Sequence, residues 1–325
     1  MLKMENSTTI ATPIITEPPE VDCQAFEGEP WKCDTIIRAK RAAGCLSVIG
    51  CLFTIFLIVF FKKYKETSQR LIINLSVAAA LLASGTLIDD FVYKEVNTLC
   101  KVQGALLTFF VWNCCLWIMT NVLSLYFKLV FHRNMYKYEK CLTAFCWAFP
   151  VVPMLAPFIS DMYGPAGVWC WIKNDWRWRL ADWYFLRVSS LVVFIYVMIH
   201  MTTVMYRMRD TTAASTRAQN TLNKDIKTLR VYPIVYFLVN LFPIVNRIQN
   251  AISGNEQTGY VFTLLLLQAM MDPSFGAIIA VVYVLDSRTR KKLTIKHFRE
   301  AAHKWKQAAP RIQEYSLSGT NGTAA

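Results

Sequence analysis

Three Arg or Asp side chains lie inside long apolar stretches of this 325-residue chain: Arg187, Arg247 and Asp272. Burying a charge in such surroundings is costly, so each of them is a candidate functional residue by default. Two guanidinium groups near one mouth of a helix bundle can hold an anionic ligand through paired hydrogen bonds. The same arginines can instead form ion pairs that only lock helices together, and the sequence leaves both alternatives open. The carboxylates at the same predicted level are Asp89, Asp90 and Asp182.

Neighbouring residues complete a candidate ligand site. Its predicted members are Arg187, Arg247, Asn246, Trp171 and Gln268.

A carboxylate and two prolines are candidate activation switches, because proline removes a helix hydrogen bond and permits a kink. These residues are Asp272, Pro273 and Pro243. A kinked sixth stretch suits a bundle that opens on its inner side.

Seven apolar stretches position these side chains. They span residues 42–61, 71–88, 102–127, 141–159, 183–206, 231–252 and 260–285. Each contains at least 18 residues, which as a helix suffice to cross a hydrocarbon layer of about 30 Å. Charged residues make up only 18% of the chain, against about a quarter in soluble domains. The sequence therefore predicts an all-α membrane protein, a seven-transmembrane helix bundle with a C-terminal amphipathic helix.

The formal net charge of +13 is distributed unevenly between the connections. Those after the first, third and fifth stretches carry 4, 4 and 6 Lys or Arg residues, against 2, 3 and 0 after the second, fourth and sixth. By the positive-inside rule, the N-terminus lies outside and the C-terminus in the cytoplasm. Arg38, Lys40 and Arg41 run against this bias, but the sum over the connections outweighs them. The basic charge thus faces lipid headgroups and cytosolic partners, and we expect no nucleic acid as a partner.

Three segments follow from this topology. Residues 1–41 are predicted to form an extracellular N-terminal tail, in which Asn6 is a glycosylation acceptor because it begins an Asn-Ser-Thr triplet. Residues 42–285 form the seven-helix domain, and residues 286–325 form a cytoplasmic amphipathic helix and a disordered tail. The apolar side of that helix is predicted from residues spaced i, i+3, i+4 and i+7. They are Phe298, Ala301, Ala302 and Trp305.

Four of the ten cysteines lie in predicted outer segments, where the environment is oxidising. They are Cys23, Cys33, Cys100 and Cys170, and three pairings are possible. We favour Cys100 with Cys170, because this bond would hold the fourth connection across the mouth of the bundle, leaving Cys23 to pair with Cys33. The six cysteines inside the apolar stretches are expected to pack, since no His or Cys pair has metal-ligand spacing. We expect neither a metal nor another cofactor.

The apolar stretches help to separate several classes of seven-helix protein. A retinal protein needs a Schiff-base lysine, and 260–285 contains none. A metal-dependent membrane hydrolase needs a cluster of ligands, and His200 is the single histidine in these stretches, so we expect no enzyme. A transporter usually shows internal repeats, and none is visible. A receptor fits best, and the alternative is a channel or transporter that uses Asp272 and the two arginines as a polar pathway.

Four segments, in consistent order along the chain, resemble one receptor family. They read Trp-Asn-Cys-Cys-Leu-Trp at 112–117, Cys-Trp-Ala-Phe-Pro at 146–150, Trp-Cys-Trp-Ile at 169–172 and Val-Asn-Arg-Ile at 245–248. On these segments the chain resembles the cyclic AMP receptor-like G protein-coupled receptors, typified by slime-mould chemotactic receptors with relatives in animals. The resemblance covers the middle of the chain, whereas both termini and the first and last stretches match poorly.

The resemblance implies a plasma-membrane receptor that signals to heterotrimeric G proteins, with Cys100 and Cys170 forming its bridge. It leaves the extracellular ligand open, because animal relatives need not respond to cyclic AMP, and the two arginines favour a small anionic molecule. Basic residues on the predicted inner face are then candidates for G-protein docking. They are Lys128, Arg133, Arg207, Arg209 and Arg230.

Overall fold

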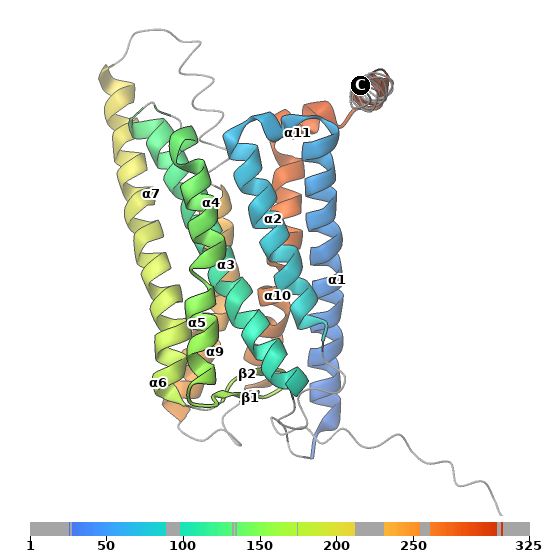
Figure 1. The fold of residues 1–325 in the computed structure, drawn as a ribbon, viewed down its shortest axis with the longest axis vertical. Helices are drawn as coiled ribbons and strands as arrows, with labels where there is room; N and C mark the ends of the chain where they lie inside the picture. Colours follow the sequence, from blue (N-terminus) through green and yellow to red (C-terminus); the bar gives the residue numbers. More distant parts are fainter. Residues whose placement is uncertain are drawn as a thin grey trace, which may run out of the picture.

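Long helices lie side by side in the computed structural model of the chain, with a small β hairpin at one end and the short helix α11 at the other (Figure 1). The structure describes residues 26, 28–88, 98–131, 133, 135–173, 175–211, 231–253, 261–303 and 307. We call the two ends the hairpin end and the α11 end. By the charge bias of the connections, the hairpin end is the predicted outer face.

The helices carry the residues of the predicted apolar stretches. The long helices are α1 (Pro30–Phe60), α2 (Thr67–Thr86), α3 (Thr98–Val130), α7 (Phe185–Thr211), α9 (Val231–Ser253) and α10 (Phe262–Leu285). The shorter helical elements are η1 (Lys63–Lys65), η2 (Met135–Tyr138), α4 (Glu139–Ala148), α5 (Val151–Leu155), η3 (Ala156–Phe158), α6 (Trp176–Arg179), η4 (Leu180–Tyr184) and α11 (Ser287–Lys292). Strands β1 (Tyr163–Pro165) and β2 (Cys170–Ile172) pair antiparallel, with Tyr163 opposite Ile172.

Helical structure is present in each of the seven predicted stretches. Within the described residues, four segments are long and apolar enough to cross a membrane. They are Pro30–Phe60, Thr98–Lys128, Met135–Phe158 and Phe262–Leu285. The described part of the chain is therefore mostly helical, with four long apolar helical segments, and the two-stranded hairpin is a small departure from the all-α prediction.

Helix α1 begins at Pro30 rather than at the predicted residue 42. Proline suits the first turn of a helix, because its missing N–H would have no partner there. Charged and apolar side chains alternate around this part of α1. Arg38 is exposed and pairs with Asp34, with Nη2 and Oδ2 2.8 Å apart, whereas Ile36 is fully buried. Residues 30–41 therefore belong to α1 and not to a tail. The helix begins before its uniformly apolar part, which starts at residue 42.

The predicted fourth stretch, 141–159, is a broken helix. α4 ends shortly before Pro150, and η3 carries Pro157 in its first turn. Proline lacks the N–H that would continue the helical hydrogen bonds, so the stretch is divided into α4, α5 and η3. The two prolines predicted as switches behave differently, because Pro243 and Pro273 lie inside the continuous helices α9 and α10.

Small residues allow α1 to pack closely along α10. A Cβ atom on Gly276 would overlap the Sγ of Cys51 and the Oγ of Ser47, both of which are fully buried. A Cβ atom on Gly50 would lie 3.0 Å from the Cβ of Ala280. Glycine is needed at these positions because two helix backbones approach each other closely.

At the α11 end, Lys63 of η1 joins several elements. Its Nζ donates hydrogen bonds to the hydroxyl oxygens of Tyr283 at 3.2 Å and Thr289 at 2.9 Å. The Tyr283 hydroxyl in turn donates to Gln69 Oε1 at 2.8 Å. Lys63 is only 9% exposed. These four residues, which we call the Lys63 clasp, connect η1 and α2 to the last turn of α10 and to α11.

The predicted amphipathic helix after α10 is present in two pieces. Asp286 caps the first piece, α11, and a second helical segment covers residues 295–303. Phe298 of the second segment contacts Phe60 and Phe61, with ring centroids 5.4 and 5.0 Å away. The apolar side of this segment therefore packs against the end of α1.

Gly276→Ala is expected to destabilise the protein, because the added methyl group would force α1 and α10 apart. Overpacking of this kind costs about 1–3 kcal/mol, which should lower the melting temperature in nanodiscs by about 2–10 °C. Gly85→Ala is the matched control, since its Cβ would meet only the flexible Leu107 side chain, at 3.3 Å. Equal melting temperatures for the two variants would contradict this account of the α1–α10 contact.

Candidate functional site

A cavity of about 100 Å³ lies within the helix bundle beside the hairpin. Its charged lining residues are Lys40, Asp182, Arg247 and Asp272. Aromatic side chains from the hairpin region, Trp169 and Trp171, also line it. An apolar wall is contributed by α3 and α10, and it includes Val111, Ile118 and Phe275.

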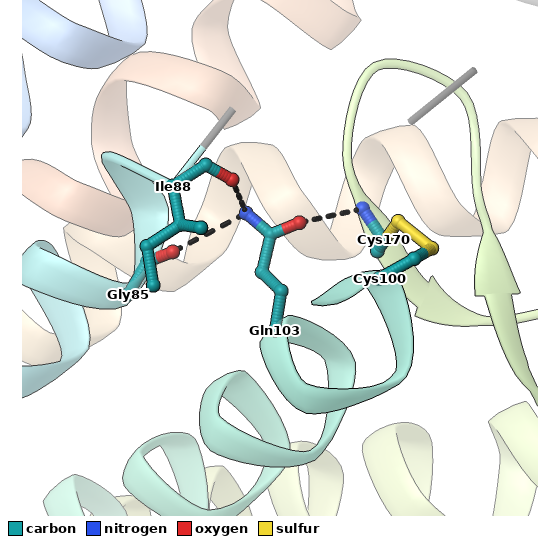
Figure 2. Close-up of a disulfide and its surroundings, with 5 residues drawn as sticks. All are labelled: Gly85, Ile88, Cys100, Gln103 and Cys170. Carbon is teal, nitrogen blue, oxygen red and sulfur yellow. Dashed lines mark hydrogen bonds between the residues drawn. A yellow bond between two sulfur atoms is a disulfide. The ribbon is translucent and has the colours of Figure 1, made fainter. Parts of the chain in front are cut away.

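The hairpin is fastened to the bundle by a disulfide between Cys100 and Cys170, whose Cα atoms are 5.3 Å apart. This is the pairing that the sequence favours. Gln103 of α3 adds a second link (Figure 2), because its Oε1 accepts the Cys170 N–H at 3.2 Å. The Nε2 of the same side chain donates to the carbonyl oxygens of Gly85 at 3.2 Å and Ile88 at 2.7 Å. One buried amide therefore connects α2, α3 and β2.

Both tryptophans beside Cys170 reach the cavity. Trp171 lies in β2, Trp169 lies in the bend that precedes it, and both side chains line the cavity. Both indoles contact Arg247, whose guanidinium carbon lies 4.9 Å from the ring centroid of Trp171 and 5.9 Å from that of Trp169. Arg247 is only 4% exposed. The indole faces stabilise this buried cation.

Lys40 of α1 is the second cation of the cavity. It is 3% exposed, and its Nζ lies 5.5 Å from the ring centroid of Trp169. The same indole therefore lies beside both Lys40 and Arg247, which are far apart in the sequence. Because the ring face carries partial negative charge, it lowers the cost of holding two cations close together.

Two carboxylates also line the cavity. Asp182 lies in η4, a π-helical turn of the kind that often occurs at functional sites. It is buried and accepts a hydrogen bond from Trp112 Nε1 at 2.8 Å. Asp272 of α10 is linked to α9 through two amides. Asn246 Nδ2 donates to Gln268 Oε1 at 2.6 Å, and Gln268 Nε2 donates to Asp272 Oδ2 at 3.4 Å.

A surface cluster also holds the chain next to the hairpin. Asp161 pairs with Lys101 at 2.6 Å and with Lys173 at 3.2 Å. Hydrogen bonds from these two ammonium groups hold the pKa of the Asp161 carboxyl below its usual value. The resulting stabilisation is present above the ordinary pKa of the carboxyl and is lost as pH falls through the lowered one. Because the carboxyl is exposed, this link is weak, and the disulfide and Gln103 are the stronger attachments.

The arrangement is suited to recognising a small polar molecule that also has an apolar part. Charged groups in surroundings shielded from water form strong hydrogen bonds with a ligand, and the indole faces and apolar wall can contact its body. In the described part of the chain, no group of three His, Cys, Asp or Glu side chains is arranged to hold a metal ion.

Most of the predicted site residues meet at this cavity. Its lining includes Trp171, Arg247, Gln268, Asp272 and Pro273. Asn246 does not line it but bonds to Gln268. Pro243 lies in α9 between Asn240 and Arg247, which both line the cavity, but it is not itself a lining residue. Arg187 lies in α7, and its side chain is outside the described part of the structure, so its role stays a prediction.

Three residues that form or support the cavity are not predicted as site residues from the sequence: Lys40, Trp169 and Gln103. For Trp169, the unexpected feature is its contact with both cations. Lys40 did carry a signal, because it belongs to the basic group that runs against the positive-inside bias. The early start of α1 explains this exception, since it places Lys40 within the helix. Asp182 is expected from the sequence only as an ion-pair partner, and the structure places it in the cavity wall. The tryptophan contact depends on the path of the hairpin, for which the sequence carries no local signal.

Several predictions fall outside the described residues. They concern Asn6, Cys23, Asp89, Asp90, Arg230, Trp305 and the tail 308–325. Cys33 is disulfide-bonded, and its pairing with Cys23 stays a prediction. Lys128 lies in the last turn of α3, and Arg133 is exposed in the connection that follows. Arg207 and Arg209 lie in α7, with side chains outside the description.

Comparison with known proteins points to one family. The family model described as "Slime mold cyclic AMP receptor" matches residues 35–294. Cyclic AMP receptor-like protein A of Dictyostelium discoideum is 25% identical over 283 residues, which cover 86% of this chain and 71% of that protein. Cyclic AMP receptor 4 of the same organism is 22% identical over 250 residues, 74% of this chain and 55% of that protein. Adhesion G-protein coupled receptor G4 of Mus musculus is 25% identical over 182 residues, 52% of this chain and 6% of that protein.

Cys100→Ser and Cys170→Ser are expected to reduce surface expression and melting temperature equally, because each removes the same bond. Loss of a disulfide typically costs about 2–5 kcal/mol. The double variant should be no worse than either single variant. Cys141→Ser, at an exposed free cysteine, is the matched control and should behave like the parent. Additive losses in the double variant would show that the two cysteines act independently.

Proposed function

Because the chain belongs to the slime mold cyclic AMP receptor family, we propose that it acts at the plasma membrane as a seven-transmembrane receptor for an extracellular ligand. The family consists of G protein-coupled receptors, which are multi-pass membrane proteins and not enzymes. In the proposed orientation, the N-terminus and the hairpin end face outward and the α11 end faces the cytoplasm. The excess of Lys and Arg in alternate connections supports this orientation.

The observation that carries the proposal is the pair of buried cations beside one indole. Lys40 and Arg247 are 3% and 4% exposed, and both lie within 6 Å of the Trp169 ring. An anionic group of a ligand would form charge-assisted hydrogen bonds with them. Two of the relatives are named for cyclic AMP, which carries such a group, so cyclic AMP is one candidate among small anions.

Helix α10 provides a direct path from the cavity to the α11 end. Gln268 and Asp272 lie beside the cavity, and Tyr283 belongs to the Lys63 clasp. Gln268 and Tyr283 are about 22 Å apart along the helix. Pro273 lies between them and weakens the helix at that point. A ligand that binds one arrangement of α10 more tightly would therefore shift the population of the clasped state.

Family membership implies coupling to G proteins, and the proposed docking surface is the basic face at the α11 end. Its candidate residues are Lys128, Arg133, Arg207, Arg209 and Arg230. Binding would favour an inner opening between the helices, in which Pro243 and Pro273 act as flexible points.

The test is nucleotide exchange on a panel of purified G proteins, with the full chain in nanodiscs and with cyclic AMP and related anionic metabolites as probes. Exchange above the empty-nanodisc level would support the receptor function, and stimulation by one probe would identify a ligand. Ion or solute flux in liposomes without any G protein, together with no exchange, would favour the alternative function of a channel or transporter.

Arg247→Ala and Lys40→Met are expected to raise the concentration of the stimulating probe that gives half-maximal exchange. A hydrogen bond to a charged group contributes about 1.5–3 kcal/mol, which corresponds to a loss of roughly 10- to 150-fold. Lys101→Met is the matched control, because it removes a cation at the hairpin end that pairs with Asp161 outside the cavity. Unchanged potency and unchanged basal exchange in Arg247→Ala would remove Arg247 from the proposed site.

Lys63→Met is expected to increase exchange without any ligand, by several-fold, because it releases α10 and α11 from η1. Lys65→Met, at an exposed lysine of the same short helix, should leave basal exchange unchanged. Surface expression measured in parallel corrects for differences in receptor amount. Basal exchange that is equal or lower in Lys63→Met would contradict the view that the clasp restrains the inner end.

A further inference from the structure

We infer that the ligand of this cavity is a small zwitterion with an aromatic or apolar body, rather than a simple anion. Its anionic group is held by Lys40 and Arg247, and its cationic group by Asp272. This inference rests on the proposed receptor function, and it adds the chemical class of the ligand.

Among the residues that the structure describes, the charges of the cavity lining are balanced. Lys40 and Arg247 contribute two positive charges, and Asp182 and Asp272 contribute two negative ones. All of these side chains come from helices of a membrane protein, where a net buried charge is costly. A simple anion would bring one or more uncompensated negative charges into this site. A zwitterion exchanges one set of ion pairs for another and leaves the net charge of the site unchanged.

The charges are also separated along the cavity. Lys40 and Arg247 lie at the level of the hairpin, because both contact the Trp169 ring. Gln268 is close to the level of Arg247, since it bonds to the preceding residue, Asn246. Asp272 follows Gln268 by one helical turn of α10 and is therefore about 6 Å further from the hairpin. The site thus presents cations near its outer end and a carboxylate further in.

The cavity is also lined by groups that can contact an uncharged body. Trp171 lies beside Arg247, with its ring 4.9 Å from the guanidinium carbon. Val111, Ile118 and Phe275 form the apolar wall. Aromatic and apolar surface of this kind contributes to affinity by burial, while the charged groups fix the orientation of the ligand. A small amphoteric molecule with an aromatic ring has both features.

The second carboxylate, Asp182, balances the protein's own cations and does not hold the cationic group of the ligand. Asp182 accepts a hydrogen bond of 2.8 Å from Trp112 and comes from η4, on the side of the cavity formed by α3 and α7. Its charge counterbalances the cations at the outer end. Asp272 is the carboxylate on α10, the helix that also carries part of the Lys63 clasp, so a cationic group bound there acts directly on that helix.

The experiment uses two series of probes that share a body and differ in charge. L-phenylalanine, 3-phenylpropionate and 2-phenylethylamine form one series, and L-tryptophan, indole-3-propionate and tryptamine form the other. Binding to the full chain in nanodiscs is measured for each probe by the shift in melting temperature and by calorimetry. In at least one series, the zwitterion is expected to bind at least tenfold more tightly than the matched anion and cation.

Two variants test which group holds which charge. Asp272→Asn keeps the shape of the side chain and is expected to shift the preference at least tenfold toward the anion. Lys40→Met is expected to shift it toward the cation. A purely structural role would lower the affinity of all three probes together and leave their order unchanged. Should either variant fail to fold, the double variant Lys40→Met with Asp272→Asn restores the charge balance and is expected to lose the preference for the zwitterion.

Nucleotide exchange is measured on the same nanodiscs, so that two kinds of failure are distinguishable. Exchange on a G protein, combined with anions that bind as tightly as the zwitterions or with no zwitterion bound, would overturn the inference and leave the receptor function in place. Zwitterion preference without exchange on any G protein would support the charge assignment and count against the receptor function.

Discussion

The cost of placing charged side chains inside an apolar helix bundle governs the architecture of the hairpin end. Lys40 and Arg247 are almost completely buried, and each lies against an indole of the segment around β2. That segment can stabilise them only if it is held in place over the bundle. The disulfide to Cys100 and the hydrogen bonds of Gln103 provide this attachment (Figure 2). The burial of the two cations therefore depends on the disulfide and on Gln103, which hold the indoles in place.

The packing of α1 on α10 places a second constraint on the molecule. Gly276 allows the two backbones to approach so closely that even a methyl group does not fit, and Gly50 contributes to the same contact. Lys40 on α1 and Asp272 on α10 are therefore carried by two closely packed helices, whereas Arg247 comes from α9. A ligand that contacts all three side chains would connect α9 to that pair.

Sequence reasoning locates the elements well because long apolar stretches are unmistakable in composition. It also identifies Arg247, Gln268 and Asp272, since polar side chains are conspicuous within such stretches. It places the start of the first helix too late, because an apolar window ends where charged residues begin, and α1 continues beyond that point. The same error hides Lys40. The proline-rich fourth stretch shows a similar limit, because composition reports that a segment is apolar but not where its hydrogen bonds are interrupted.

The segment Trp169-Cys170-Trp171 shows how a short pattern acquires meaning only from its attachment. Trp171 lies in β2 and Trp169 in the bend that precedes it, and both indoles line the cavity. Because Cys170 lies between them and is bonded to Cys100 of α3, the disulfide holds both indoles over the bundle. Lys40 contacts the Trp169 ring, and Arg247 contacts both rings. The bond to Cys100 is therefore what allows two cations to be buried at the mouth of the bundle.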